Sequence, residues 1–284
     1  GTAGGGGPAR VPRPAPPAPG VSAPRGGGGT AGRADGAGGG ALGAPGGHWT
    51  RNIALSPDGG RLYIAIGSAG NIGEEPLPRA SVQVLDLASG QQETFASGLR
   101  NPVGIALRPG SDEVWVTVNE RDGLGEKLVP DYLTRLVPQG FYGWPYAYIG
   151  PHPQPGFAER RPDLVAASLV PDLLFRAHSA AMAVVFQADG GFPAAWHGDA
   201  FVALRGSWNA GTPRGYMVVR VPMTDGRPDG GYEAFVTGFR LDAEGESGRA
   251  EVWGRPVGLA WAADGSLLIA DDTSGSVWRV AYRP

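Results

Sequence analysis

Short apolar runs separated by Gly, Pro, Asp and Asn cover most of the chain after residue 48. Such runs predict β-strands joined by turns, and the 3.6-residue spacing that would predict helices is rare in this part of the chain. Clear examples are residues 62–66, 81–85, 114–118, 200–204, 216–221, 266–270 and 276–280. The pattern therefore predicts an all-β fold.

A recurring phrase precedes several of these runs. Residues 51–59 (RNIALSPDG), 101–110 (NPVGIALRPG) and 255–265 (RPVGLAWAADG) each read as strand, tight turn, strand, and 183–190 (AVVFQADG) is a weaker copy. Repeats of about 40–50 residues with four strands each are typical of a β-propeller. A β-sandwich with recurrent hairpins would not explain why one phrase precedes the same turn each time. The sequence has room for about four such units.

The first 47 residues have a different composition from the rest. Gly, Ala and Pro supply 36 of these 47 positions, and every Trp, Tyr and Phe of the chain lies after them. A segment without large apolar side chains cannot bury enough surface to offset its ordering entropy. We therefore expect a disordered Gly/Pro/Ala-rich segment at 1–47, followed by a partial propeller domain at 48–284.

Composition excludes several classes of site and partner. The chain has no cysteine, which rules out disulfides, thiolate zinc sites, iron–sulfur ligation and cysteine nucleophiles. Its formal net charge is −3, so no basic face is implied and we expect no nucleic-acid partner. No run approaches the ~18 apolar residues of a membrane helix, and the first residues lack the apolar core of a signal peptide.

Histidine and arginine stand where the repeats begin. His48 precedes the first repeat phrase, and it is the best candidate base because an imidazole titrates near neutrality. Arg51, Arg100 and Arg255 occupy repeat entrances, and equivalent loops of a propeller converge on one mouth. Convergent guanidinium groups would suit an anionic ligand. The alternative is that each arginine caps its own blade through carbonyl contacts.

Residues 119–132 form a polar stretch in which no strand is expected. Its acidic residues are Glu120, Asp122, Glu126 and Asp131. Carboxylate and backbone carbonyl oxygens are ligands that calcium accepts. The alternative is an acidic loop that is simply solvated.

Six motifs in a fixed order carry a family resemblance. They are GLRNPVG (98–104), NERD (119–122), PDY (130–132), FYGWP (141–145), RGSWN (205–209) and GRPVGL (254–259). Over about residues 47–284 the chain resembles the glucose/sorbosone dehydrogenase family, the soluble sugar dehydrogenases that depend on pyrroloquinoline quinone (PQQ). It is most similar to the sorbosone dehydrogenase-like branch.

The resemblance implies a six-bladed propeller that binds PQQ and calcium and oxidises an aldose or a sorbosone-type sugar. In this reading His48 is the base that takes the hydroxyl proton of the sugar while hydride passes to the quinone. An external electron acceptor would reoxidise the cofactor, and the family implies a periplasmic or secreted protein.

The resemblance also implies roles for residues around the cofactor. Arg100 and Asn101 match the pair that holds the cofactor and polarises its reactive carbonyl. Arg255 matches an arginine that pairs with a PQQ carboxylate, and Arg205 stands where the family places a basic cofactor contact. The implied calcium ligands are largely backbone carbonyls of the loop that contains Glu120, Arg121 and Asp122.

The chain departs from the family at its start, because about a third of the implied ring precedes the segment that begins at His48. We therefore expect an N-terminally truncated member with about four blades, whose open ring would expose sheet edges and leave the chain weakly folded or inactive alone. Two other readings remain. One is a non-catalytic propeller that binds a ligand or partner. The other is a calcium-dependent lactonase-type propeller, which would need metal-ligating carboxylates around the axis.

Overall fold

The structure of the protein is a computed structural model that describes residues 42–43, 46–188, 191–242 and 248–283. All of these lie in the second of two compact units, Gly38–Pro284. The disorder expected for residues 1–47 falls almost wholly on residues 1–41 and 44–45, outside the described residues. That expectation stays a prediction.

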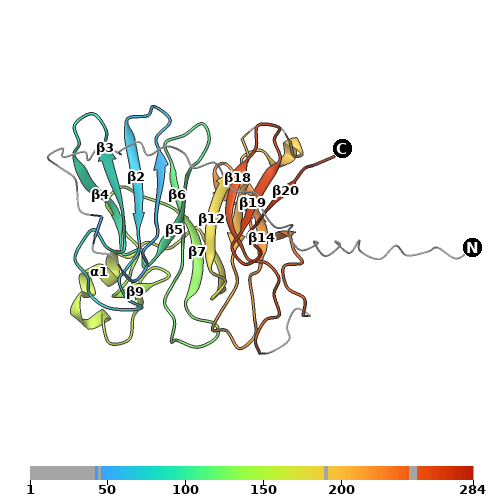
Figure 1. Cartoon of the computed structure of the whole chain (residues 1–284). Coiled ribbons are helices and arrows are strands. Elements are labelled where there is room, and N and C mark those ends of the chain that lie inside the picture. Colours follow the sequence, from blue (N-terminus) through green and yellow to red (C-terminus); the bar gives the residue numbers. More distant parts are fainter. Residues whose placement is uncertain (1–41, 44–45, 189–190, 243–247, 284) are drawn as a thin grey trace, which may run out of the picture. The chain divides into compact units, whose positions relative to one another are not determined.

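Four consecutive antiparallel sheets dominate the described residues (Figure 1). The first contains β1 (Arg51–Leu55), β2 (Arg61–Ile66), β3 (Ser81–Asp86) and β4 (Gln92–Ser97), and β8 (Gly140–Phe141) adds to β4 in parallel. The second contains β5 (Pro102–Leu107), β6 (Val114–Val118), β7 (Pro130–Arg135) and β11 (Leu173–Ala177). The third contains β12 (Ala181–Phe186), β13 (Ala200–Leu204), β14 (Met217–Val221) and β17 (Glu233–Val236). The fourth contains β18 (Pro256–Trp261), β19 (Leu267–Asp271) and β20 (Ser276–Val280).

Small elements complete the described part of the chain. Two hairpins pair β9 (Ala147–Tyr148) with β10 (His152–Pro153) and β15 (Met223–Thr224) with β16 (Arg227–Pro228). The helical elements are α1 (Pro162–Ala167) and two 3₁₀ turns, Ala158–Arg160 and Ala194–Trp196. None of the helices among these residues has the length and apolar character to cross a membrane.

The repeat phrases form the first hairpin of each sheet. They correspond to β1, β5, β12 and β18, each followed by its antiparallel partner. Gly59, Gly110 and Gly265 have φ of 72°, 72° and 79°, a region that favours glycine, which explains why the turn of the phrase ends on this residue. The predicted strands at all seven runs are confirmed. The fourth turn glycine, at 190, lies outside the described residues.

The first strands of successive sheets lie against one another. β1 contacts β5, β5 contacts β12, and β12 contacts β18. Three apolar clusters fill the space between neighbouring sheets. Tyr63 and Val116 belong to the cluster between the first and second sheets, and Trp115 and Val202 to the next. Phe201 and Leu267 join the third and fourth sheets. Sheets whose first strands meet and whose faces pack in sequence are the arrangement of propeller blades.

The sequence reading was wrong at the end of the polar stretch. Residues 130–132 begin strand β7 rather than belonging to a loop, and Asp131 and Tyr132 are buried. The strand forms because Tyr132 and Leu133 pack into the clusters on the two sides of the second sheet. Tertiary packing therefore overrides the polar appearance of this segment.

Topology gathers a particular set of loops at one end of the sheets. Because neighbouring strands are antiparallel, the segment before the first strand of a sheet and the segment after its second strand emerge at the same end. This is the lower end in Figure 1, where β9 and α1 are drawn. The segments 46–50, 67–71, 98–101, 119–126, 178–180, 205–216 and 254–255 all reach it.

Phe201 packs between the third and fourth sheets, so truncation of its side chain should destabilise the fold. It is fully buried, and its ring contacts Phe192, Phe235 and Trp261 at 6.2, 4.9 and 5.5 Å between centroids. We expect Phe201→Ala to lower the free energy of unfolding by about 3–5 kcal/mol in urea titrations. Val277→Ala on the exposed face of β20 is the control, with an expected change within about 0.5 kcal/mol. Equal stability of the two variants would contradict this account.

Candidate functional site

His48 is attached to the loop after β2 at two points. Its backbone N–H donates to the Ser68 carbonyl at 3.0 Å, and its Nδ1 lies 2.9 Å from Ser68 Oγ. Gly67 lies between His48 and Asn101, and a Cβ added at residue 67 would clash with His48 Cβ and Asn101 Oδ1. The structure therefore brings the candidate base and Asn101 together, and it does so because residue 67 has no side chain.

Arg100 is buried and uses its guanidinium to join loops. Nε donates to Asn71 O at 2.9 Å, and one terminal nitrogen donates to Asn119 O and Glu120 O at 3.1 and 2.9 Å. The other terminal nitrogen donates to Asn71 Oδ1 at 3.0 Å. Four of its five N–H groups are thus directed at protein acceptors. Arg100 thus contacts loop carbonyls, which was the alternative to binding an anionic ligand.

Arg51, at the start of the first sheet, also donates to backbone carbonyls. Its guanidinium donates to the carbonyls of Leu42, His48 and Thr50, each at 2.9 Å. Arg79, which lies under the same segment, donates to Gly46 O and Gly67 O, each at 3.0 Å. These two arginines shape the backbone on both sides of His48.

The environment of His48 keeps its imidazole neutral. Burial, followed by the charge of Arg100, lowers the pKa of His48 from its usual 6.5 to about 4. Arg79 also lowers this pKa, whereas Asp122 raises it. At neutral pH the ring is therefore an uncharged proton acceptor.

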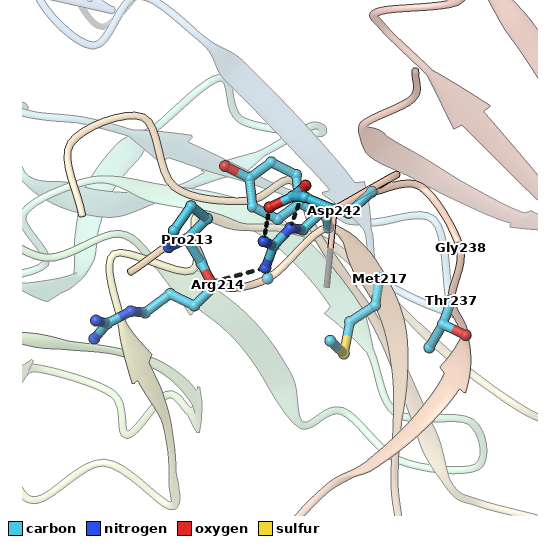
Figure 2. A pocket seen from close by; sticks show the side chains of 9 residues that line it. Pro213, Arg214, Met217, Thr237, Gly238 and Asp242 are labelled. Atoms are coloured by element: carbon cyan, nitrogen blue, oxygen red, sulfur yellow. Dashed lines mark hydrogen bonds and ion pairs between the residues drawn. The ribbon is translucent and has the colours of Figure 1, made fainter. Parts of the chain in front are cut away.

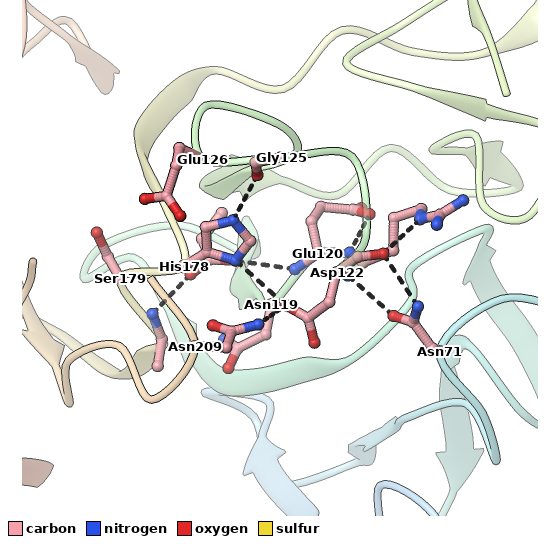
Figure 3. Close-up of polar contacts among 12 residues, drawn as sticks. Asn71, Asn119, Glu120, Asp122, Gly125, Glu126, His178, Ser179 and Asn209 are labelled. Atoms are coloured by element: carbon pink, nitrogen blue, oxygen red, sulfur yellow. Dashed lines mark hydrogen bonds and ion pairs between the residues drawn. The ribbon is translucent and has the colours of Figure 1, made fainter. Parts of the chain in front are cut away.

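Asp122 connects loops of the first three sheets (Figure 3). Its Oδ1 accepts a hydrogen bond from Asn209 Nδ2 at 2.7 Å and lies 3.2 Å from His178 Nδ1. Its backbone N–H donates to Asn71 Oδ1 at 2.9 Å, and its carbonyl accepts from Asn71 Nδ2 at 3.0 Å. His178 Nε2 lies 2.9 Å from Gly125 O, so His178 contacts the loop 119–126 at both Asp122 and Gly125.

Two buried acids lie beneath this network. Asp131 accepts from the Glu120 N–H at 2.8 Å and from the Ala180 N–H at 2.7 Å, so it joins the loops before β7 and β12. Burial raises the pKa of Asp131 to about 6, and it raises the pKa of Glu120 to about 7. Both side chains are buried, and burial favours the uncharged form of each carboxyl group. Both act as parts of the loop framework.

The residues predicted to bind calcium do not fit that role in this arrangement. The Glu120 carbonyl accepts from the Arg100 guanidinium, and the Asp122 carbonyl accepts from Asn71 and from Arg121 Nε at 2.9 Å. A cation at these oxygens would face the positive charge of Arg100 at the Glu120 carbonyl and of Arg121 at the Asp122 carbonyl. Among the described residues, no group of three or more His, Asp or Glu side chains could hold a metal ion.

Arg255 lines a hollow of about 590 Å³ between loops of the third and fourth sheets. Trp208, Asn209 and Tyr216 line it as well, and Trp208 is 78% exposed. The Arg255 guanidinium lies 4.9 Å above the centre of the Tyr216 ring and donates to Gly206 O at 3.1 Å. A cation beside exposed aromatic surface suits a planar anionic molecule. The residues present therefore fit PQQ, which is a planar tricarboxylate.

Arg205 lies near Arg255 but is paired. Its Nε donates to Asp272 at 2.7 Å, and the backbone N–H of Asp272 donates to the Arg255 carbonyl at 3.2 Å. This pair joins the third and fourth sheets. Asn209, which lines the hollow, also donates to Asp122, so the hollow and the loops around His48 belong to one connected network.

A second, smaller hollow of about 170 Å³ lies beside the first and is shown in Figure 2. Arg240 spans it, donating to Pro213 O at 3.1 Å and pairing with Asp242. Met217 and Thr237 form other parts of its wall. Arg240 is paired with Asp242, and Arg214, which also lines the hollow, is paired with Glu126, so these charged groups connect loops to one another.

Sequence reasoning missed Ser68, Asn71, His178 and Asn209 as members of the site. Asn209 was part of a quoted motif, but its partner Asp122 is 87 residues away in the chain. His178 contacts the loop 119–126 only because β11 ends beside β7. Their spacing along the chain carries no signal of these contacts.

Comparisons with known proteins show what the chain is similar to. Residues 164–283 match the family model described as TrAA12-like. A PQQ-dependent pyranose dehydrogenase of Coprinopsis cinerea is 27% identical over 81% of this chain and 39% of its own length. An uncharacterized protein of Borreliella burgdorferi is 29% identical over 83% of this chain and 61% of its own length. The chain thus spans less than two thirds of the length of these relatives.

A solved structure shows the same fold. The holo form of the PQQ domain of pyranose dehydrogenase from Coprinopsis cinerea superimposes with a TM-score of 0.65 and 25% identity, covering 83% of this chain and 70% of that domain. A glucose dehydrogenase and the soluble aldose sugar dehydrogenase of Escherichia coli are further structural neighbours, with TM-scores of 0.59 and 0.54. The comparisons therefore confirm the resemblance that the motifs indicated, to the glucose/sorbosone dehydrogenase family of sugar dehydrogenases.

Proposed function

We propose that this chain carries the catalytic part of a PQQ-dependent oxidoreductase that oxidises an aldose or a sorbosone-type sugar. One observation supports this most directly. A neutral histidine, His48, and Asn101 both pack on Gly67, at the end of the sheets where Arg255 lines an open hollow. A proton acceptor, an amide and a cation at one end are the groups that oxidation beside an anionic quinone requires. In this proposal the four described sheets are blades of the six-bladed family ring.

When bound, PQQ supplies the chemistry of hydride acceptance. Arg255 would hold one of its carboxylates, because its guanidinium lines the hollow above the Tyr216 ring, and Arg249 lines the hollow as well. Asn101 would donate to the cofactor from beside His48. Arg100 would act mainly through its positive potential and through the loops it ties, and Arg205 through its pair with Asp272.

His48 would take the hydroxyl proton of the sugar carbon that is oxidised. Removing this proton as hydride departs avoids a cationic product and lowers the barrier. The base works only when unprotonated. Since the pKa of His48 is about 4, activity should be present at neutral and mildly acid pH and fall as the pH drops through about 4.

Replacing the base tests the proposed activity. We expect His48→Asn to lower kcat by on the order of 10²–10⁴-fold while PQQ affinity is retained, because asparagine keeps a donor toward Ser68 but lacks Nε2. The assay is dye-linked aldose oxidation after loading with PQQ in the presence of calcium. His152→Asn, at an exposed histidine, is the matched control. Full turnover by His48→Asn would refute the assignment of the base.

Removing the Arg255 guanidinium from the hollow tests the cofactor site. We expect Arg255→Met to weaken PQQ binding by roughly 10- to 100-fold, because a hydrogen bond to a charged group contributes about 1.5–3 kcal/mol. Quenching of tryptophan fluorescence measures it, since Trp208 lines the hollow. Arg227→Met is the control, because Arg227 pairs with Asp172 at the opposite end of the sheets. Equal affinity of both variants would place the cofactor elsewhere.

The packing of His48 and Asn101 on Gly67 provides a third test. We expect Gly67→Ala to lower the free energy of unfolding by about 1–3 kcal/mol and to reduce turnover, because the added Cβ must displace one of the two residues. Gly73→Ala is the control, since no atom lies within 4 Å of an added Cβ there. Urea titration measures the stability. A Gly67→Ala variant as stable and active as Gly73→Ala would show that His48 and Asn101 do not require glycine at residue 67.

A further inference from the structure

Among the described residues, Ser68 is the only side chain that forms a hydrogen bond with the His48 ring. Ser68 is fully buried, and its Oγ lies 2.9 Å from His48 Nδ1. Its backbone N–H donates to Arg100 O at 2.7 Å, and its carbonyl accepts from the His48 N–H. Every polar group of Ser68 is therefore engaged with the residues around the candidate base.

The hydroxyl of Ser68 has a single proton, and its destination is determined by a second contact. Ser68 Oγ lies 2.7 Å from the Gly70 carbonyl oxygen. A carbonyl oxygen can only accept, so the hydroxyl must donate to Gly70. Oγ is then left with lone pairs toward His48, and His48 Nδ1 must carry the proton of their hydrogen bond.

The Gly70 carbonyl is itself held in place. The Glu75 carboxylate accepts from the Ala69 N–H at 2.8 Å and from the Gly70 N–H at 3.0 Å. This contact fixes the turn after β2 so that Gly70 O faces the hydroxyl. The direction of the Ser68 proton thus depends on backbone geometry rather than on chance rotation of the hydroxyl.

In a neutral imidazole, a proton on Nδ1 leaves Nε2 with an unshared electron pair. We propose that Ser68 is a positioning residue that fixes His48 in the Nδ1–H tautomer and so presents Nε2 as the proton acceptor. This inference rests on the proposed function of His48 as the base. Without the acceptor at Ser68, the neutral ring would divide between two tautomers, of which only one offers Nε2.

The charged groups around the ring favour this assignment. Arg100 and Arg79 face His48 from the loops before β5 and β3, Arg51 donates to the His48 carbonyl, and Asp122 lies on the loop after β6. None of the recorded hydrogen bonds among the described residues places a carboxylate on Nδ1. A neutral hydroxyl orients the ring without holding a second proton on it, which a carboxylate partner would favour.

The tautomer can be measured without cofactor or sugar. We expect ¹⁵N spectra of the full chain labelled at histidine to show, at pH 7, a protonated Nδ1 and an unprotonated Nε2 for His48. The chain has four histidines, and the His48→Asn spectrum identifies the resonance by its absence. A protonated Nε2 in the wild-type protein would overturn the proposal. Because this readout needs no turnover, it is independent of whether the sugar oxidation itself is found.

Variants at Ser68 test the consequence. We expect Ser68→Ala to shift the His48 signals toward a mixture of tautomers and to lower kcat about tenfold with KM nearly unchanged. Ser68→Thr, which keeps the hydroxyl, should restore both. Ser111→Ala is the control, because the Ser111 hydroxyl donates to Arg108 O in a turn at the opposite end of the sheets. An unchanged tautomer and kcat in Ser68→Ala would overturn the proposal.

Discussion

The candidate site depends on the burial of one guanidinium. Arg100 lies at the start of β5 and is removed from water, so its N–H groups must find acceptors within the protein. They find them on Asn71, after β2, and on Asn119 and Glu120, after β6. Loops that belong to two different sheets are thereby held at one point. The positions of His48, Asn101 and Asp122 all follow from the backbone that this arginine ties.

The same charge sets the chemistry around it. A buried cation near His48 disfavours a second positive charge, and burial of the ring acts in the same direction. The imidazole is therefore neutral, and its two nitrogens become distinct through the Ser68 hydroxyl. A ring of this kind accepts a proton at one atom only. The loops after β13 and before β18 form the hollow, which is lined by Arg255 and by the exposed side chain of Trp208.

Several features could be predicted from local sequence because they have local causes. The repeat phrases predicted the first hairpin of each sheet, since alternating apolar residues and a turn glycine suffice to specify a hairpin. His48 and Arg255 were recognised as candidates through their places beside these phrases. Strand β7 was missed because its polar residues are buried by partners far away in the chain, as Asp131 is by the N–H groups of Glu120 and Ala180. The carbonyls predicted to bind calcium accept hydrogen bonds from Arg100 and Asn71, contacts between residues far apart in the chain that local sequence does not indicate.

By itself, the sequence determined the all-β class, the repeating hairpins and the kinds of functional group available, because these depend on residue type and on neighbours a few positions away. Only the tertiary structure decided which of those groups meet. Antiparallel topology brings segments from four sheets to one end, and the lack of a side chain at Gly67 allows His48 and Asn101 to approach. Whether an arginine faces a ligand or its own carbonyls is likewise a matter of unoccupied space and nearby acceptors. Arg100 is buried among acceptors and Arg255 lines a hollow, although both stand at the entrance of the same repeated phrase.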